Sequence, residues 1–398
     1  MEYKKTFETL GISIPNIILP KKGTGLSKFS VVAVDQYAEN NSYWDEVKNL
    51  VGDNISSLNM VIPENFLLRG DTDYNQRINT AGRYLENKDL VPYGESFIFV
   101  KRKLKGGTRC GLVAAFDLEQ YEYEPGKSNL IKVTEKTDMN RVTPRAIIRE
   151  KINLELPHIF LLVNDKQNKL MTYLEGISKN LDALYDFDLM KDGGNIKGYK
   201  IDKEETYQKI ADILYEIYEQ NDKKFSFAIG DGNHSFAAAK MHYENLKKSL
   251  GDQALNHPTR YALAEIINLY DNSMEYEPIH RLLTNIEDKQ KALSEISSIL
   301  EIPCSNEEEL SKIDLQILQP ALDTWLEKNK NVHIEYVHDK KTCLESGTDP
   351  HSLALIFDKF DKDSLVKTVQ ENKVLVRKSF SMGHPFEKRY YLEARLIK

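Results

Sequence analysis

The sequence predicts a mixed α+β fold with a largely antiparallel sheet and flanking helices. Three observations support this class. Apolar runs of strand length alternate with longer amphipathic stretches along the chain. A Gly-Gly pair at positions 106 and 107 separates two strand-like segments, 96–104 and 108–118, as expected for a β-hairpin. Hairpin-like pairs of this kind outnumber clear β-α-β units, which favours antiparallel pairing.

The first third of the chain starts this alternation. The apolar run 29–35 (FSVVAVD) has the character of a buried strand, and we expect a helix to follow with Asn41 or Ser42 as its N-cap. A second helix is expected over 74–88, before the hairpin. After a polar helical stretch, LPHIFLLVND at 156–165 has an unbroken apolar centre, which is typical of a central strand.

The remaining elements follow the same reasoning. Apolar residues at helical spacing predict helices around 170–184 and over 205–220, and 260–271 is a further strand candidate. The charged region 287–330 is expected to be helical with a break at PCSNEEEL. Short strand signals then return at NVHIEYVHD, HSLALIFDK and KRYYLEARLI.

The composition limits both the organisation and the function of the protein. The chain has 398 residues, of which 41% are hydrophobic and 29% charged, and these values suit one large domain or two packed ones. We expect a main domain over 1–282 and a C-terminal α/β portion over 283–398 packed on it.

The formal net charge of -7 argues against nucleic acid and anionic membranes as partners. Three dispersed cysteines provide neither a disulfide framework nor a CxxC metal site, and no stretch approaches the roughly 20 apolar residues of a membrane span. We therefore expect a soluble, cytoplasmic protein.

The stretch FAIGDGNHSFAAAK, 227–240, contains the most distinctive motif. Its apolar start predicts a strand that ends in Gly-Asp-Gly, and the alanine-rich remainder predicts a helix whose first turn Asn233 or Ser235 would cap. The polar cluster would then lie at the N-terminus of a helix. Such a site favours anions, because backbone N–H groups and the positive end of the helix dipole point toward it.

The individual residues of the motif suit a phosphate. Gly230 and Gly232 would let a phosphate approach the backbone, Asp231 would hold a divalent metal ion, and His234 would donate a hydrogen bond to a phosphate oxygen. The alternative is a glycine-rich turn in which the polar side chains only satisfy local amides. The motif matches neither GxxxxGK[ST] nor GxGxxG, so neither the P-loop nor the dinucleotide fingerprint applies.

GDGNHSFAAAK resembles the DGHHR-plus-alanine signature of a bacterial and archaeal family, the domain of unknown function 1015. The resemblance covers most of the chain, because further segments similar to that family follow in the expected order. These segments are VVAVDQY with YWDEV, TEKT at 134–137, ELPHIFLLVND, PIHR at 278–281 and GHPFEKRYYLE at 383–393.

The central motif also resembles that of the ParB and sulfiredoxin-like superfamily, which includes nucleotide-using switches and kinases of free serine. The resemblance implies a core of that type with extra elements, and a turn that cradles nucleotide phosphates. Asp231, Gly232 and His234 match the motif, while Asn233 stands where a histidine is common. Ser235 stands where the relatives have a phosphate-binding arginine, which leaves phosphate binding in doubt, because one hydroxyl does not replace a guanidinium.

Another cation must compensate for this departure if phosphate binds here. The sequence offers Arg281, which follows His280 in PIHR, together with Lys136, Arg141 and Arg145. We expect His280 and Arg281 to contribute to the binding of the cofactor, because apolar packing does not require such a pair.

Glu135 is the candidate catalytic base. The kinase-like relatives place an acidic residue after a histidine to activate the substrate hydroxyl, and Glu135 fits that position with Thr134 in place of the histidine. The alternative is that TEKT only caps the following helix. His158, within an apolar run, is expected to be a satisfied core histidine rather than a metal ligand.

Two further groups are candidates for the same site. Asp35 and Gln36 end the first expected strand and would face the same cleft, or form a turn. Near the C-terminus, His384, Lys388 and Arg389 would either form a solvated basic face or close the anion site.

These residues lead to two functional hypotheses. In the first, the protein is a nucleotide-dependent phosphotransferase that uses ATP or ADP with Mg²⁺ to phosphorylate a small hydroxyl compound, with free L-serine as the expected acceptor. In the second, it is a nucleotide-binding switch or regulatory module without turnover. Glu135 favours the enzyme, because a switch has little need of a carboxylate that activates a hydroxyl. A homodimer is compatible with the sequence. A sulfiredoxin-like activity is excluded, because the turn contains no cysteine.

Overall fold

The computed structural model describes residues 2–32, 37, 40–63, 74–127 and 129–398, and it confirms the mixed α+β class. The chain forms two compact units. The first comprises Met1–Met274, Val366–Lys373 and His384–Lys398, and the second comprises Glu275–Leu365 and Val374–Gly383. This division differs from the expected 1–282 and 283–398, because the chain returns to the first unit twice.

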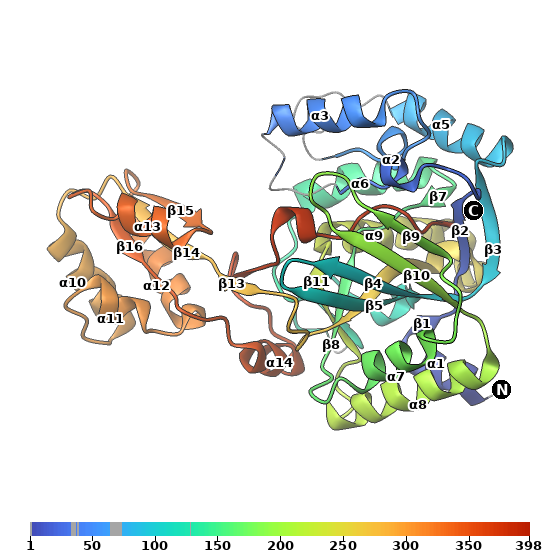
Figure 1. Cartoon of the computed structure of the whole chain (residues 1–398). Helices are drawn as coiled ribbons and strands as arrows, with labels where there is room; N and C mark the ends of the chain where they lie inside the picture. Colours follow the sequence, from blue (N-terminus) through green and yellow to red (C-terminus); the bar gives the residue numbers. More distant parts are fainter. Residues whose placement is uncertain (1, 33–36, 38–39, 64–73, 128) are drawn as a thin grey trace. The chain divides into compact units, whose positions relative to one another are not determined.

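A large mixed sheet forms the centre of the first unit (Figure 1). Within the described residues it has nine strands in the order β6-β11-β8-β12-β5-β4-β10-β9, with β1 paired to β5. β6 pairs with β11, and β8 with β12, in parallel, and the other neighbours are antiparallel. The strands are β1 (Ile12–Ser13), β4 (Phe97–Leu104), β5 (Gly107–Asp117), β6 (Ile131–Lys132), β8 (Phe160–Val163), β9 (Tyr185–Asp188), β10 (Asn195–Ile201), β11 (Phe227–Asp231) and β12 (Tyr261–Asn268).

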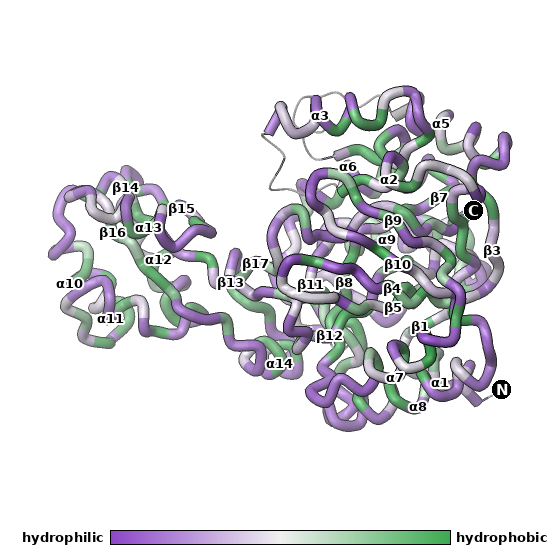
Figure 2. Tube along the Cα trace, viewed as in Figure 1, coloured by the Kyte–Doolittle hydropathy of each residue, from purple (hydrophilic) through white to green (hydrophobic). Residues whose placement is uncertain are grey.

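The sheet confirms the two clearest strand predictions. β4 and β5 form the expected hairpin, with Leu104 paired to Gly107 across the turn. β8 lies between β11 and β12, as the unbroken apolar run predicted. Figure 2 shows hydrophobic residues in the region of β12. β11, which carries the Gly-Asp-Gly motif, is therefore held by neighbours on both sides.

Helices surround this sheet. The rings of Phe7 in α1 and Tyr207 in α8 each lie 5.4 Å from that of Phe97 in β4, so both helices pack on one face. Ile98 and Val100 alternate to the opposite face and join a core that includes α5. The helices are α1 (Glu2–Leu10), α2 (Leu26–Phe29), α3 (Asn41–Val51), α5 (Tyr74–Glu86), α6 (Met139–Lys151), α7 (Lys169–Ser178), α8 (Glu204–Gln220) and α9 (Asn233–Leu250), with 3-10 turns at Ser57–Asn59, Leu118–Gln120, Gly251–Asn256, Pro258–Arg260 and Pro385–Glu387.

The C-terminal segment is integrated into the first unit. β18 (Arg395–Leu396) pairs with β7 (Leu154–Glu155), while Tyr390 and Ala394 form single bridges with Val32 and Ile18. Ile18 belongs to a separate two-stranded sheet of β2 (Asn16–Pro20) and β3 (Leu90–Glu95). These pairings explain why the last 15 residues do not belong to the second unit.

The second unit has a smaller antiparallel sheet in which β14 lies between β15 and β16, and a separate β13–β17 pair. Its helices bury Trp325 and Leu293 in a local core. The bounds are β13 (Tyr276–Pro278), β14 (His280–Thr284), β15 (His333–Val337), β16 (Leu353–Leu355), β17 (Phe380–Met382), α10 (Lys289–Leu300), α11 (Glu307–Ser311), α12 (Leu315–Lys328), α13 (Lys340–Ser346) and α14 (Lys362–Gln370), the last of which ends in the first unit. Across the described part of the chain, no helix is long and apolar enough to cross a membrane.

Two local predictions need correction. The expected strand over 29–35 starts differently, because Phe29 ends α2, where its N–H donates to Gly25 O. A buried aromatic residue suits the end of a helix as well as a strand, so the apolar run alone did not distinguish them. The N-cap of α3 is Asn40, whose side chain accepts a hydrogen bond from Tyr43 N, rather than Asn41 or Ser42.

Candidate functional site

The predicted strand-to-helix turn is confirmed. β11 ends at Asp231, and α9 begins at Asn233. The N-cap is Gly232, in the left-handed conformation with φ 82° and ψ 24°, rather than Asn233 or Ser235. Because a glycine has no side chain, the cap supplies no side-chain acceptor for the backbone amides of the first turn of α9; only its carbonyl accepts, from Ser235 N and Phe236 N.

Both glycines of the motif are required by packing. A Cβ added at Gly232 would lie 2.9 Å from a side-chain carbon of Ile159 and 3.0 Å from its Cα. At Gly230 the added atom would meet Leu162 at 2.9 Å. β8 and the residue before it therefore demand glycine at both positions, whether or not a phosphate binds.

The TEKT segment lies beside the motif. The Thr134 hydroxyl donates to Ile229 O of β11 at 2.7 Å, and Asn233 Nδ2 donates to Thr137 Oγ1 at 3.1 Å. Glu135 lies between these two anchored threonines in the chain, and its side chain is half-buried. The structure thus brings together two segments that are almost a hundred residues apart in sequence.

Helix α6, which follows TEKT, has its own cap. Its N-cap is Asp138, whose Oδ1 accepts from Asn140 N at 3.0 Å, so the suggestion that TEKT serves as the cap is not supported. The backbone N–H of Asp138 also points to Nε2 of His234 at 3.4 Å. An Nε2 that accepts a hydrogen bond leaves the ring proton on Nδ1.

The side-chain amide of Asn233 makes only some of the hydrogen bonds that it could make. The residue is 6% exposed, and within the described part of the chain its Oδ1 has no hydrogen-bond partner. Thr137 Oγ1 both donates and accepts, so either orientation of the amide satisfies that contact. In either case one polar atom of this buried amide has no hydrogen-bond partner among the described residues.

Asp231 is paired with a lysine from the C-terminal segment. Its Oδ1 accepts from Gly232 N at 2.8 Å, and its Oδ2 lies 3.3 Å from Nζ of Lys388. The Lys388 side chain is only 10% exposed, and that of Asp231 is 32% exposed. Lys388 and Arg389 are both buried, which contradicts the solvated basic face for these two residues.

A buried charge network lies behind Lys388. Arg389 forms ion pairs with Glu265 at 2.7 Å and with Glu393 at 2.6 Å. Burial opposes the charge on Arg389, but the two carboxylates outweigh it and raise its pKa. A Cβ at position 111 would lie 2.1 Å from Glu265 Oε1, so Gly111 makes room for this carboxylate.

Two further arginines hold the turn that carries Lys388. Arg102 donates to the main-chain carbonyls of Phe386, Glu387 and Lys388, and Arg109 donates to that of Glu387 at 2.7 Å. Both arginines are essentially inaccessible to solvent. Burial, reinforced by the charge of Arg109, lowers the pKa of Arg102 to about 9.

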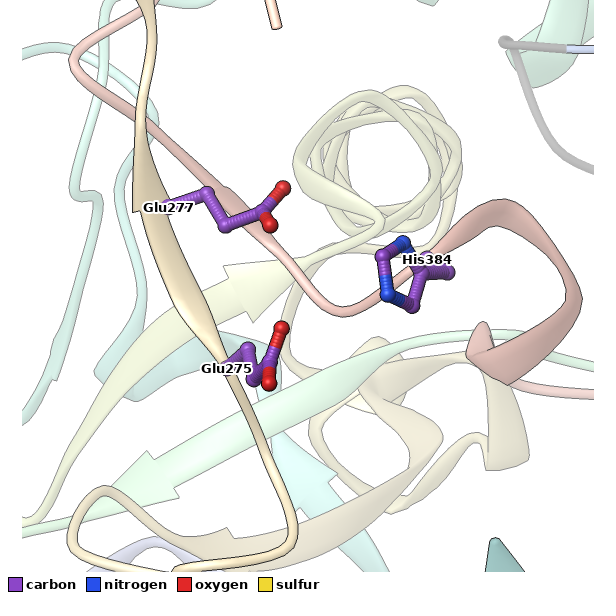
Figure 3. A group of neighbouring side chains, drawn as sticks. All are labelled: Glu275, Glu277 and His384. Atoms are coloured by element: carbon purple, nitrogen blue, oxygen red, sulfur yellow. The ribbon is translucent and has the colours of Figure 1, made fainter. Parts of the chain in front are cut away.

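The metal ligand set around Asp231 is small. Within the described residues, Asp231 belongs to no group of three or more potential ligands. Mg²⁺ is compatible with one carboxylate when phosphate oxygens and water complete its shell. Figure 3 shows Glu275 and Glu277 at the β13 segment of the second unit, and also His384. We assign no metal site to these three residues, because His384 belongs to the first unit.

His280 and Arg281 lie in the second unit. Arg281 is fully buried, and its guanidinium donates to Gln319 Oε1 and to the carbonyl of Arg377, at 2.7 and 3.0 Å. His280 Nδ1 accepts from Phe357 N at 3.2 Å. These contacts account for both side chains within the fold of that unit.

The other expected cations lie in the TEKT segment and in α6. Lys136 is exposed, while Arg145 Nη1 donates to Arg141 O at 2.7 Å within α6. Ser235 is half-buried, and its N–H donates to Gly232 O at 3.0 Å. Asp35 and Gln36 lie outside the described residues.

His158 has a structural partner. Its Nδ1 lies 2.8 Å from the hydroxyl of Tyr391, and the two rings meet edge to face. This contact agrees with the expectation of a satisfied histidine, although the residue is half-buried rather than part of the core.

Sequence reasoning missed Arg102 and Arg109. The available signal was an arginine at matching positions on both sides of the Gly-Gly turn, but Lys101 and Lys103 beside Arg102 give that end of the strand the character of a solvated surface. Such residues are rarely buried without a specific partner.

Comparisons with solved structures give weak likenesses. A conserved hypothetical protein from Pyrococcus furiosus aligns at 11% identity over 70% of this chain and 94% of its own, with a TM-score of 0.35. A free serine kinase in complex with AMP aligns at 11% identity over 70% of this chain and 90% of its own, with a TM-score of 0.37. A mutant free serine kinase in complex with ADP gives 10% identity, 70% and 91% coverage, and a TM-score of 0.38. Scores this low do not establish a shared fold.

No curated protein is significantly similar to the chain. A family model, in contrast, covers nearly all of it. The model described as "Protein of unknown function (DUF1015)" matches residues 18–393, a range that contains the GDGNH turn, the TEKT segment and Lys388. The chain therefore belongs to the DUF1015 family.

Proposed function

We propose that the protein is a nucleotide-dependent phosphotransferase that acts on a small hydroxyl compound, with free L-serine as its preferred acceptor. One observation carries the proposal. The turn at the start of α9 carries Asp231 and is capped by Gly232. Two buried polar groups lie at this turn: the ammonium of Lys388 and the side-chain amide of Asn233, which lacks one hydrogen-bond partner among the described residues. A nucleotide phosphate would accept hydrogen bonds from the ammonium and from the backbone amides, and from Asn233 with its amide turned so that Nδ2 is the unbonded atom.

The phosphate is expected at the first turn of α9. The helix dipole and the backbone amides attract an anion there. Asn233 and His234 would add side-chain donors, the latter through Nδ1. The resemblance of the motif to the ParB and sulfiredoxin-like superfamily, in which this turn cradles nucleotide phosphates, supports the same placement.

Glu135 is assigned the role of general base. It would accept the proton of the acceptor hydroxyl while the hydroxyl oxygen forms a bond to the terminal phosphorus. The bond from that phosphorus to its bridging oxygen breaks, so that ATP leaves as ADP, or ADP as AMP. Asp231 would hold Mg²⁺, which neutralises the charge of the phosphate oxygens when it is bound. The choice of serine rests on the resemblance to kinases of free serine.

A nucleotide-binding switch without turnover is the second candidate. The Asp231–Lys388 ion pair favours it, because the expected metal ligand and the lysine beside it already bind each other. A pair that must open for a ligand gives two states, as a switch requires. Homodimer formation stays a prediction that analytical ultracentrifugation tests.

Calorimetric titration tests the feature that both candidates share. The protein is titrated with ATP, ADP and pyrophosphate, each with and without Mg²⁺. We expect saturable binding of at least one nucleotide, strengthened by Mg²⁺. If none of the three compounds binds, the enzyme and the switch are both excluded.

A further inference from the structure

We infer that Lys388 is the cation that binds the phosphate, and that Arg102 and Arg109 are positioning residues that hold it in place. The inference rests on the proposed phosphate site at the start of α9. It assigns to Lys388 the charge that Ser235 does not supply.

The position of Lys388 follows from its contact with Asp231. One oxygen of this carboxylate accepts from Gly232 N at 2.8 Å, and the other lies 3.3 Å from the ammonium. The carboxylate therefore bridges the cap of α9 and the lysine. A phosphate at the first turn lies within reach of the same ammonium, because a flexible four-carbon stem carries it.

Hydrogen bonds to its main-chain carbonyls hold the turn that bears Lys388. Arg102 and Arg109 stand directly opposite each other on β4 and β5, on the same face of the hairpin. Together they donate to three consecutive carbonyls, those of residues 386–388. A guanidinium suits this task, since its fixed fork of donors serves several acceptors at once.

The arrangement is costly for stability. The two arginines repel each other, and within the described part of the chain Nε and Nη2 of Arg109 have no hydrogen-bond partner. Apolar residues in such positions are often neutral or stabilising relative to buried charges. A functional requirement for a fixed Lys388 accounts for the cost.

Binding would exchange partners within the ion pair. The ammonium would turn from Asp231 Oδ2 to a phosphate oxygen, and Asp231 would then be the residue that holds Mg²⁺. The incoming phosphate and metal ion thus replace each charge contact that is lost.

Variants of Lys388 test the first half of the inference. Lys388→Met should weaken binding of Mg²⁺–ADP or pyrophosphate by about 10- to 100-fold, the effect of losing one charge-assisted hydrogen bond. Lys388→Arg should recover most of the affinity. Lys240→Met is a matched control. Lys240 is also a buried lysine with carboxylate partners, Glu122 and Glu244. It lies further along α9, where its ammonium donates to Leu118 O. Affinity within about twofold of wild type in Lys388→Met would overturn the inference.

A double-mutant cycle tests the second half. Arg109→Met should lower affinity about tenfold in the wild-type background and have almost no effect in the Lys388→Met background, because it acts through that lysine. Arg109→Lys provides a milder variant if the first one fails to fold. Losses that simply add would show that Arg109 supports the fold without positioning Lys388.

The two levels of the account fail separately. If wild-type protein binds neither ADP nor pyrophosphate, the proposed function itself is wrong. If wild-type protein binds them and Lys388→Met binds them equally well, the phosphate site stands and only the assignment of Lys388 is wrong.

Discussion

Lys388 and Asp231 form an ion pair at the start of α9, with Nζ 3.3 Å from Oδ2 and nine-tenths of the lysine side chain buried. The pair joins the strand-to-helix turn of the motif to a segment near the C-terminus. It leaves the carboxylate one-third exposed. Asp231 is therefore accessible to a metal ion, provided that Lys388 finds another partner.

Asp231→Asn separates the metal role from the ion pair. The amide keeps the shape of the side chain but binds Mg²⁺ poorly, so the strengthening of nucleotide binding by Mg²⁺ should be lost. In the absence of Mg²⁺ the variant should bind pyrophosphate more tightly than wild type, because Lys388 no longer has a competing carboxylate. Titration calorimetry with and without EDTA measures both effects. An unchanged Mg²⁺ dependence would favour a purely structural Asp231.

Glu135→Gln separates binding from catalysis. The amide preserves the shape and cannot accept the hydroxyl proton, so nucleotide affinity should persist while turnover falls by roughly 10²–10⁴-fold. Nucleotide affinity, product formation and thermal stability are measured on the same preparation. Glu244→Gln, in the C-terminal half of α9, serves as a carboxylate control and should keep normal turnover. Normal turnover in Glu135→Gln would exclude Glu135 as the base.

Gly232→Ala tests the tight approach of the turn to Ile159. The variant combines positive φ with a Cβ 2.9 Å from a side-chain carbon, and should lower the free energy of unfolding by roughly 1–3 kcal/mol. Gly23→Ala is the control, because Gly23 also has a positive φ, 94°, with no atom within 4 Å of its added Cβ. Urea denaturation of both variants isolates the steric part. Equal losses in the two variants would mean that Ile159 moves away without cost.

His242 should make the fold acid-sensitive. Burial, with the positive charges of Arg149, Lys398 and His257, lowers the pKa of this α9 residue to about 4. The unfolded chain, with a histidine pKa near ~6.5, then binds the proton more readily, so stability is complete above that pH and declines as the pH falls toward 4. Denaturant midpoints between pH 7 and 5 should fall in wild type and fall less in His242→Gln. The same slope in both proteins would contradict this origin.

The sequence was most informative where local chemistry decides the structure. The Gly-Gly hairpin, the central strand β8 and the β11–α9 turn each follow from glycine positions and apolar runs, and all three are present. Phe29 shows the limit of this reasoning, because an apolar run fits a buried helix end as well as a strand.

The composition of the site was less predictable. TEKT and the motif meet through hydrogen bonds such as Thr134 to Ile229 O, which depend on the parallel pairing of β6 with β11. Lys388 reaches Asp231 only because the C-terminal segment returns to the first unit. No local pattern encodes such long-range contacts, so sequence reasoning proposed Arg281 and not Lys388 as the leading cation.

The most direct test of the central claim is a turnover assay. Purified protein is incubated with Mg²⁺, with ATP, ADP or pyrophosphate as donor, and with a panel of amino acids and sugars, and mass spectrometry follows the phosphorylated products. The account predicts O-phosphoserine from serine and a nucleotide, with one donor molecule consumed for each product molecule. Nucleotide binding without a phosphorylated product from any acceptor would contradict the phosphotransferase and leave the switch.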